Sequence, residues 1–156
     1  MSVVATATEG VDVDIEALAA DAQRMLDGVG EEWELSLLVC DDTFIQPLNA
    51  QWRGKDAATD VLSFPQLETE TPGQLPSGQG HLLGDIVISL QTATRQATQL
   101  GHTTEAELRV LVAHGLCHLM GYTHANAADR AVMQAEEVRL LAAAGTEMPS
   151  LVERNS

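Results

Sequence analysis

The sequence has few cysteines and no long apolar run. Cys40 and Cys117 are its only two cysteines and form no CxxC pair, which excludes a disulfide scaffold and favours two small buried apolar side chains. The apolar runs are a handful of residues long, far short of the roughly 20 needed to span a bilayer, so no membrane partner is expected. The first residues, MSVVATATEGVDVD, lack the basic and apolar regions of a secretory signal. We therefore expect a cytoplasmic protein.

Basic residues are also scarce. Lysine and arginine number 8 against 23 aspartates and glutamates, for a net charge of −15, and Lys55 is the one lysine. Such a balance is typical of an acidic, solvated surface and argues against a general nucleic-acid binder, so no DNA partner is expected. Any anionic substrate must be held by a few well-placed cations.

Length and composition indicate one globular domain. The chain has 156 residues, of which 45% are hydrophobic, and a chain of this size buries roughly 70% of its unfolded surface. Residues 1–11 are interpreted as a loose N-terminal end, 12–145 as the domain and 146–156 as a C-terminal tail.

Hydrophobic periodicity predicts an α/β fold with an α+β-like arrangement. We expect a small mixed four-stranded sheet covered by about five helices. The pattern itself locates three strands, over 33–40, 61–64 and 82–90, and five helices, over 12–27, 42–53, 91–100, 104–120 and 126–144.

Two helix starts carry specific expectations. Thr104 and Glu107 match a capping box at the start of the fourth helix. Pro47 lies within the second helix, where its missing donor is unfavourable. That helix is therefore expected to start late or to have a distorted first turn.

Three of the five histidines lie in one segment, HGLCHLMGYTH, residues 114–124. His114 and His118 are four residues apart, so they project from one helix face. Gly121 is suited to a left-handed helix end, after which the chain can bring His124 over the same face. Three imidazoles leave one zinc position open, as in catalytic sites. The spacing predicts one Zn²⁺ per chain at His114, His118 and His124, the alternative being ordinary surface or core histidines.

The spacing HxxxHxxGxxH is also that of metzincin peptidases. Those enzymes carry a glutamate general base directly after the first histidine. Gly115 occupies that position here, so the peptidase interpretation lacks its proton acceptor.

Four sequence blocks resemble the YbeY-type bacterial endoribonucleases, which act in ribosomal RNA maturation. The blocks are residues 48–56 with the run RGKD, residues 59–65 (TDVLSFP), residues 83–89 (LGDIVIS), and residues 114–124 followed by Met133. The resemblance extends over about residues 35–142. It departs at Thr123, where the family usually has aspartate. A carboxylate that orients a histidine would be lost there, which would lower metal affinity.

The resemblance implies a zinc-dependent, single-strand-specific endoribonuclease. Its implied substrates are ribosomal RNA precursors, with a role in 3′-end processing of 16S rRNA and in ribosome quality control. Its implied partners are the small ribosomal subunit or ribosomal proteins. The resemblance assigns the three histidines to the metal, and it assigns catalysis to Arg53 and His114. The residues alone leave an alternative for Arg53, which could simply cap the carbonyls at a helix end.

Two other functional hypotheses remain open at this point. One is a metallopeptidase, and the other is a non-catalytic, zinc-containing ribosome-assembly factor, which the charge of −15 favours. For a nuclease, either water or the ribose 2′-hydroxyl could be the nucleophile. Among other polar residues, Asp60 and Asp85 are expected to cap amides, Lys55 to be surface, and His81 and His102 to have no functional role.

Overall fold

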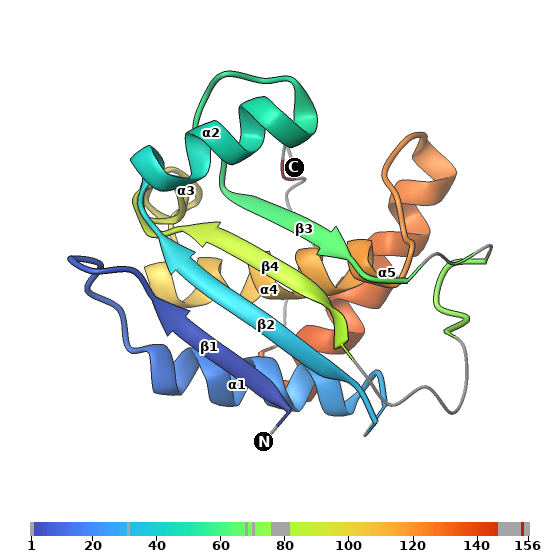
Figure 1. The fold of residues 1–156 in the computed structure, drawn as a ribbon. Helices are drawn as coiled ribbons and strands as arrows, with labels where there is room; N and C mark the ends of the chain where they lie inside the picture. Colours follow the sequence, from blue (N-terminus) through green and yellow to red (C-terminus); the bar gives the residue numbers. More distant parts are fainter. Residues whose placement is uncertain are drawn as a thin grey trace.

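Strands and helices come together as an α/β domain in the computed structural model, which describes residues 2–30, 32–67, 69, 71–75, 82–146 and 154. Within these residues the elements are, in order, β1 (Val3–Ala7), α1 (Ile15–Asp27), β2 (Glu34–Cys40), α2 (Asp42–Arg53), β3 (Val61–Pro65), β4 (Leu82–Ser89), α3 (Leu90–Leu100), α4 (Thr104–Leu119) and α5 (Ala127–Ala143). Figure 1 shows the sheet at the centre of the molecule. Across the described helices, none is both long and apolar enough to cross a membrane.

The sheet is mixed and has four strands in the order β1-β2-β4-β3. Strands β1, β2 and β4 are parallel, and Val3 pairs with Leu35. Strand β3 is antiparallel to β4, with Val61 opposite Ile88. The predicted fold class, a small mixed four-stranded sheet with five helices, is confirmed.

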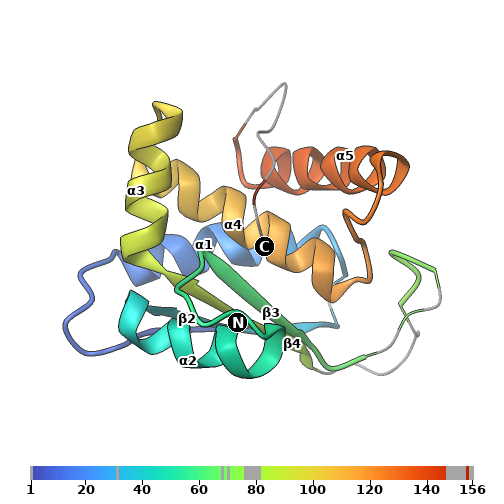
Figure 2. The ribbon, with the colours of Figure 1, turned by 90° about the horizontal axis from the view of Figure 1, so that it is seen from above.

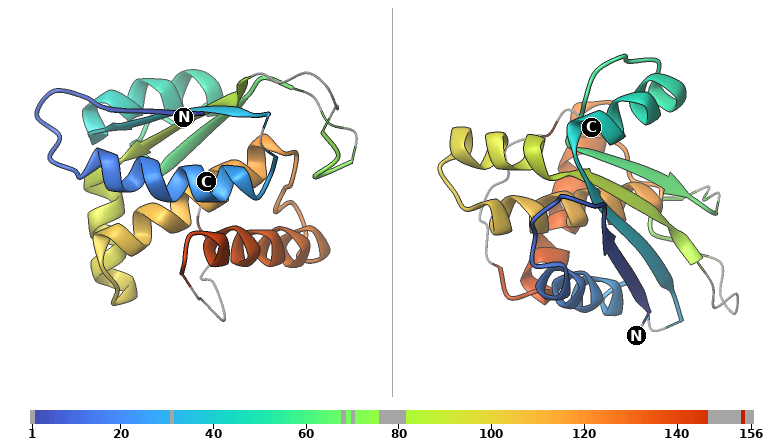
Figure 3. Two further views of the ribbon diagram at one scale, coloured as in Figure 1. Left: turned by 90° about the horizontal axis from the view of Figure 1, so that it is seen from below. Right: turned by 60° about the vertical axis from the view of Figure 1, so that its left-hand side comes forward.

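The two faces of the sheet are covered differently. Successive residues of a strand point to opposite faces, and on β4 Ile86 and Ile88 join the main core while Val87 joins a smaller cluster with Ile45 of α2. Figure 2 shows α2 alone on one side of the sheet and α1 and α4 on the other. Helix α5 packs on the far side of α4 (Figure 3). Helix α4 is thus enclosed between the sheet and α5.

The prediction of a loose N-terminal end over residues 1–11 is wrong for Val3–Ala7, which form the edge strand β1. Val3 is buried in the main core, and Gln23 Oε1 on α1 accepts hydrogen bonds from the Ser2 and Val3 amides at 3.0 and 3.1 Å. Val4 faces solvent and is 66% exposed. A five-residue edge strand with one strongly buried side chain leaves little periodic signal in the sequence.

The helix starts differ from expectation at two places. The N-cap of α4 is Thr103, whose hydroxyl accepts from the Ala106 amide at 3.1 Å, so the prediction of a capping box formed by Thr104 and Glu107 is wrong. Helix α2 starts at Asp42 and continues through Pro47, so it does not start late.

Both cysteines are buried and unbridged, as expected. Burial raises the pKa of Cys40 to about 12, and the charges of Asp41 and Asp42 add to the effect. The thiol of Cys40 is therefore neutral and acts as an apolar core group.

A charged cluster around Glu107 connects α4 to the C-terminal tail. Glu107 is fully buried, and Arg154 donates to its two carboxylate oxygens at 2.8 and 2.6 Å. Gln96 of α3 and His102 also donate to it, at 2.8 and 2.6 Å. Arg154, which belongs to the segment predicted as a C-terminal tail (146–156), is therefore buried against α4.

Replacing Arg154 with alanine should lower the free energy of unfolding by about 3 kcal/mol, because it leaves the Glu107 carboxylate buried without its guanidinium partner. The control is Arg95→Ala, which removes an ion pair to Asp42 whose arginine side chain is 59% exposed and should cost less than about 1 kcal/mol. Urea unfolding followed by circular dichroism measures both. Equal losses would contradict the assigned role of Arg154.

The environment of Glu107 also makes the free energy of unfolding depend on pH. Burial raises its pKa, but the hydrogen bonds and charge of Arg154, with hydrogen bonds from His102 and Gln96, outweigh burial and hold the pKa below the ordinary 4.5. The resulting stabilisation is complete above the unfolded-state pKa of about 4.3 and is lost as the pH falls through the folded-state value. Glu107→Gln should flatten the decline of the unfolding free energy below about pH 4.3, and an unchanged slope would refute this assignment.

Candidate functional site

The three histidines of residues 114–124 converge at the C-terminal end of α4. Their metal-ligating nitrogens all lie within 4.8 Å of one another. His114 and His118 share one face of α4, and Gly121 adopts a φ of 94°, the left-handed conformation that turns the chain. His124 then returns so that its ring lies 5.6 Å from His114 and 5.1 Å from His118, measured between centroids. The structure thus brings the three predicted ligands together.

Hydrogen bonds at the Nδ1 atoms orient two of these rings. His118 Nδ1 lies 3.0 Å from the Tyr122 carbonyl oxygen, which only accepts, so this Nδ1 carries the proton. His114 Nδ1 lies 3.2 Å from the carboxylate of Glu137 and donates to it in the same way. In the neutral rings the Nε2 lone pairs then face each other at 3.1 Å, a repulsive arrangement unless a cation or proton lies between them.

This arrangement fits a bound metal ion. A tetrahedral zinc ion with Zn–N bonds of about 2.0–2.1 Å holds neighbouring nitrogens about 3.3 Å apart. The observed Nε2–Nε2 distance of 3.1 Å between His114 and His118 is close to that value. The donor set is all imidazole, which suits Zn²⁺, Ni²⁺ and Cu²⁺.

Glu137 of α5 is a functional candidate that the sequence analysis missed. Its side chain is buried against His114, where a carboxylate fixes the tautomer and raises the basicity of a metal-binding imidazole. The family resemblance places such a carboxylate at position 123, where this chain has threonine. Thr123 instead donates a hydrogen bond to Asp129 at 3.3 Å. Glu137 comes from a different helix, so spacing within the histidine segment gives no signal for it.

Gly115 and Cys117 lie in the packed interior of α4. A Cβ atom added at Gly115 would lie 2.9 Å from Ile86 Cδ1 and 3.1 Å from its Cγ1, so this position faces strand β4. Cys117 is fully buried, and burial together with the charge of Glu137 raises the pKa of its thiol well above the ordinary value. The interpretation of Cys117 as a core residue is confirmed.

Tyr122 supports the turn that carries His124. Its hydroxyl donates to the Glu136 carboxylate at 3.0 Å. Partial burial and this hydrogen bond raise the pKa of Tyr122 above the ordinary 10.0, so the hydroxyl stays protonated at neutral pH. Tyr122 therefore ties the turn to α5 through its side chain while its carbonyl orients His118.

A cleft of about 740 Å³ opens beside the imidazoles. Helix α2 contributes Trp52 and Arg53 to its lining, β3 contributes Phe64, and the end of α4 and the following turn contribute His118 and His124. The described residues of this lining include no aspartate or glutamate. The described part of the cleft lining therefore lacks the negative charge that is typical of the chain as a whole.

Of the remaining candidates, those that the structure describes lie outside this lining. Lys55 is exposed, as predicted for a surface residue. Asp60 Oδ1 accepts from the Val61 amide at 2.7 Å, the amide-capping role expected for it, whereas no described contact assigns that role to Asp85. His102 contacts Glu107 rather than the cleft, and His81 lies outside the described residues.

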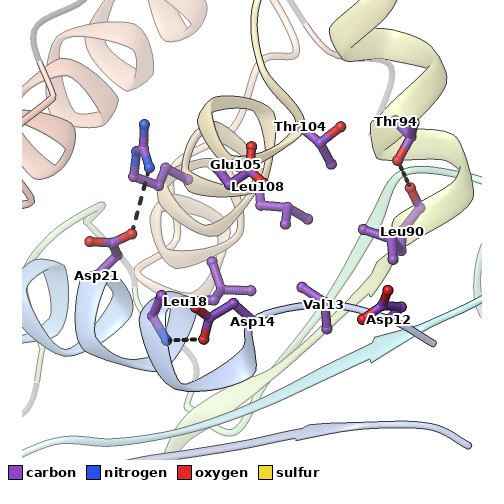
Figure 4. A pocket seen from close by; sticks show the side chains of 12 residues that line it. Asp12, Val13, Asp14, Leu18, Asp21, Leu90, Thr94, Thr104, Glu105 and Leu108 are labelled. Carbon is purple, nitrogen blue, oxygen red and sulfur yellow. Dashed lines mark hydrogen bonds and ion pairs between the residues drawn. The ribbon is translucent and has the colours of Figure 1, made fainter.

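A second cavity, of about 480 Å³, lies at the opposite end of α4 (Figure 4). Asp12, Asp14, Asp21 and Glu105 contribute carboxylates to its lining. Its one guanidinium, that of Arg109, lies 3.8 Å from Asp21. Such a lining repels anionic polymers. Of these two cavities, the cleft beside the histidines is therefore the one suited to an anionic substrate.

Replacing His118 with alanine should reduce the bound metal well below one equivalent, because two imidazoles hold a cation far more weakly than three. The control is His102→Ala, a histidine outside the cleft. Elemental analysis of the purified proteins measures the metal per chain. Full occupancy in the His118 variant would refute the assigned ligand set.

Glu137→Gln should weaken metal binding about 10- to 100-fold, because an amide polarises the imidazole less than a carboxylate does. The neighbouring Glu136→Gln makes the same change of charge one residue away. A glutamine amide oxygen can still accept the hydrogen bond from the Tyr122 hydroxyl, so the metal affinity should stay within about threefold of wild type. Competition with a chromogenic chelator measures both affinities. Equal losses of metal affinity in the two variants would show that the affinity depends on the net charge near the site and not on the contact between Glu137 and His114.

Comparison with known proteins identifies relatives over most of the chain. The family model described as Endoribonuclease YbeY matches residues 4–145. Endoribonuclease YbeY of Pelotomaculum thermopropionicum is 46% identical over 127 residues, which is 80% of this chain and 82% of that protein. The Endoribonuclease YbeY of Salinispora tropica is 41% identical over 149 residues, 91% of this chain and 95% of that protein.

A solution structure of a protein from Thermotoga maritima shares the fold, with a TM-score of 0.58 at 21% identity, over 96% of this chain and 99% of that chain. The sequence matches extend through both the Arg53 region and the histidine segment. The resemblance noted in the sequence is thereby confirmed: this chain belongs to the YbeY endoribonuclease family.

Proposed function

We propose that this protein is a zinc-dependent endoribonuclease that cuts single-stranded RNA in the cleft beside His118 and His124. The proposed substrates are ribosomal RNA precursors in the cytoplasm, with processing at the 3′ end of 16S rRNA and ribosome quality control as the cellular roles. The proposed partners are the small ribosomal subunit and ribosomal proteins. Family membership and the names of the relatives support the nuclease activity.

The observation that carries the proposal is the local charge of the cleft. The whole chain has a net charge of −15, which repels RNA at long range. Among the described residues, the cleft presents Arg53 and two imidazoles without any carboxylate in its lining. The cleft therefore has local charges that suit a polyanion, although the net charge of the chain repels one at long range.

The proposed metal ligands are His114, His118 and His124, with one zinc ion per chain. When bound, zinc supplies Lewis acidity to the phosphate and lowers the pKa of a bound water toward about 7. Glu137 and the Tyr122 carbonyl hold the protons on Nδ1 of His114 and His118, which presents Nε2 of both rings toward the same point.

Arg53 is proposed as the residue that binds and stabilises the scissile phosphate. It is exposed in the last turn of α2 and lines the same cleft as His118 and His124. A guanidinium binds phosphate oxygens through two parallel hydrogen bonds and remains charged at any working pH. It therefore orients the phosphate and stabilises the charge that develops during cleavage.

The geometry disfavours the peptidase alternative. A metzincin needs a carboxylate beside its first histidine to accept a proton. Gly115 faces Ile86 of β4, and the next residue, Leu116, is fully buried. A phosphodiester depends less on such a base, because a metal ion and a guanidinium stabilise its charge directly.

Arg53→Ala should reduce kcat/KM for single-stranded RNA about 100-fold or more, because the phosphate loses its guanidinium partner. Metal content and melting temperature should stay near wild type. The matched control is Lys55→Ala, which removes an exposed cation two residues away and should change cleavage less than about threefold. A 3′-labelled oligonucleotide resolved on a denaturing gel measures cleavage.

A parallel loss of stability and activity in the Arg53 variant would favour a helix-capping role for Arg53. Zinc-dependent degradation of casein that His114→Ala abolishes would favour the peptidase and require withdrawal of the nuclease proposal.

A further inference from the structure

The cleft contains a large apolar side chain that the fold leaves in solvent. Five large hydrophobic side chains are exposed among the described residues: Val4, Phe44, Trp52, Leu100 and Val132. Trp52 is the one of these that lines the cleft, and it is 62% exposed. Exposed tryptophans beside a functional cleft are typical of binding surfaces, because they gain free energy when a ligand covers them.

Phe64 fixes the position of the indole. The two ring centroids are 5.9 Å apart with an interplanar angle of 77°, an edge contact. Phe64 is half-buried on β3 and packs on the cluster that contains Ile45 and Leu62, so it is a rigid support. In a near-perpendicular contact at least one face of the indole is not covered by the phenyl ring.

We infer that Trp52, supported by Phe64, is a stacking platform for one unpaired nucleobase of the RNA. Every nucleobase has an apolar face that stacks on an aromatic ring, and each such contact strengthens binding without reading sequence. This inference rests on the proposed function and adds to it the determinant of single-strand specificity. In a duplex the base faces are covered by their neighbours, whereas a single strand can turn a base toward Trp52.

The neighbouring residue complements this platform. Arg53 follows Trp52 directly in the chain, and both line the cleft. Base and phosphate of the RNA are thus bound by consecutive residues of α2, the indole taking the apolar face and the guanidinium taking the charge. Such a pair is sequence-tolerant, and purines should bind more tightly than pyrimidines because they stack over a larger area.

Tryptophan fluorescence can report the stacking of a base on Trp52. It has two tryptophans, of which Trp33 is 2% exposed and Trp52 is 62% exposed. Titration of the metal-loaded protein with a non-cleavable analogue of an eight-nucleotide oligoadenylate should therefore quench the fluorescence of Trp52 and leave that of Trp33. Gel analysis of the recovered analogue verifies that it is not cut during the titration.

Trp52→Ala should weaken binding of the oligoadenylate about 10- to 100-fold, and Trp52→Phe should recover most of the loss. The matched control is Phe44→Ala, which removes an exposed aromatic from the same helix outside the described lining of the cleft. An abasic oligonucleotide of equal length should bind wild type and Trp52→Ala equally. In cleavage assays Trp52→Ala should lose activity on single-stranded RNA while its low activity on duplex RNA is unchanged.

Equal weakening of abasic and ordinary oligonucleotides in Trp52→Ala would overturn the platform, as would saturation with oligoadenylate without quenching. If the oligoadenylate saturates without quenching, the exposed indole of Trp52 would instead be interpreted as a contact for a protein partner. Base-dependent quenching by a protein that cleaves no RNA would support the platform and refute the proposed nuclease function, so the two failures are distinguishable.

Discussion

The burial of α4 between the sheet and α5 is the constraint on which the site depends. Most of this helix is inaccessible to solvent, and a Cβ at Gly115 would be too close to Ile86, so the rotation of the helix about its axis is set by packing. That rotation leaves His114 and His118 on the side toward α5 and the cleft. The close packing of α4 therefore also fixes the positions of the two imidazoles whose Nε2 atoms face each other.

The site, which comprises the cleft and the residues behind its imidazoles, combines polar groups from elements far apart in the chain. Helix α2 provides a cation, the end of α4 and the following turn provide imidazoles, and α5 provides the carboxylate of Glu137 behind His114. Four of the chain's 23 acidic residues line the cavity at the other end of α4. An acidic protein can therefore offer a site for an anionic substrate, because local charge governs binding at contact distance while net charge acts through screened solvent.

Local sequence signals predicted much of this arrangement, and tertiary contacts account for the rest. The helical spacing of His114 and His118 and the glycine at 121 were sufficient to predict that three imidazoles meet. Strand β1 was missed, because its pattern covers five residues and only Val3 is strongly buried. Glu137 and Arg154 were missed because their partners, His114 and Glu107, lie 23 and 47 residues away, and no local periodicity reports such pairs.

The most direct test of the account is a crystal structure of the metal-loaded protein with a non-cleavable single-stranded oligonucleotide, with anomalous data collected at the zinc edge. The account predicts one anomalous peak about 2.0–2.1 Å from nitrogens of His114, His118 and His124. It also predicts a phosphate of the oligonucleotide between that peak and Arg53. A metal bound elsewhere, or an oligonucleotide bound at the cavity lined by Asp12 and Glu105, would contradict it.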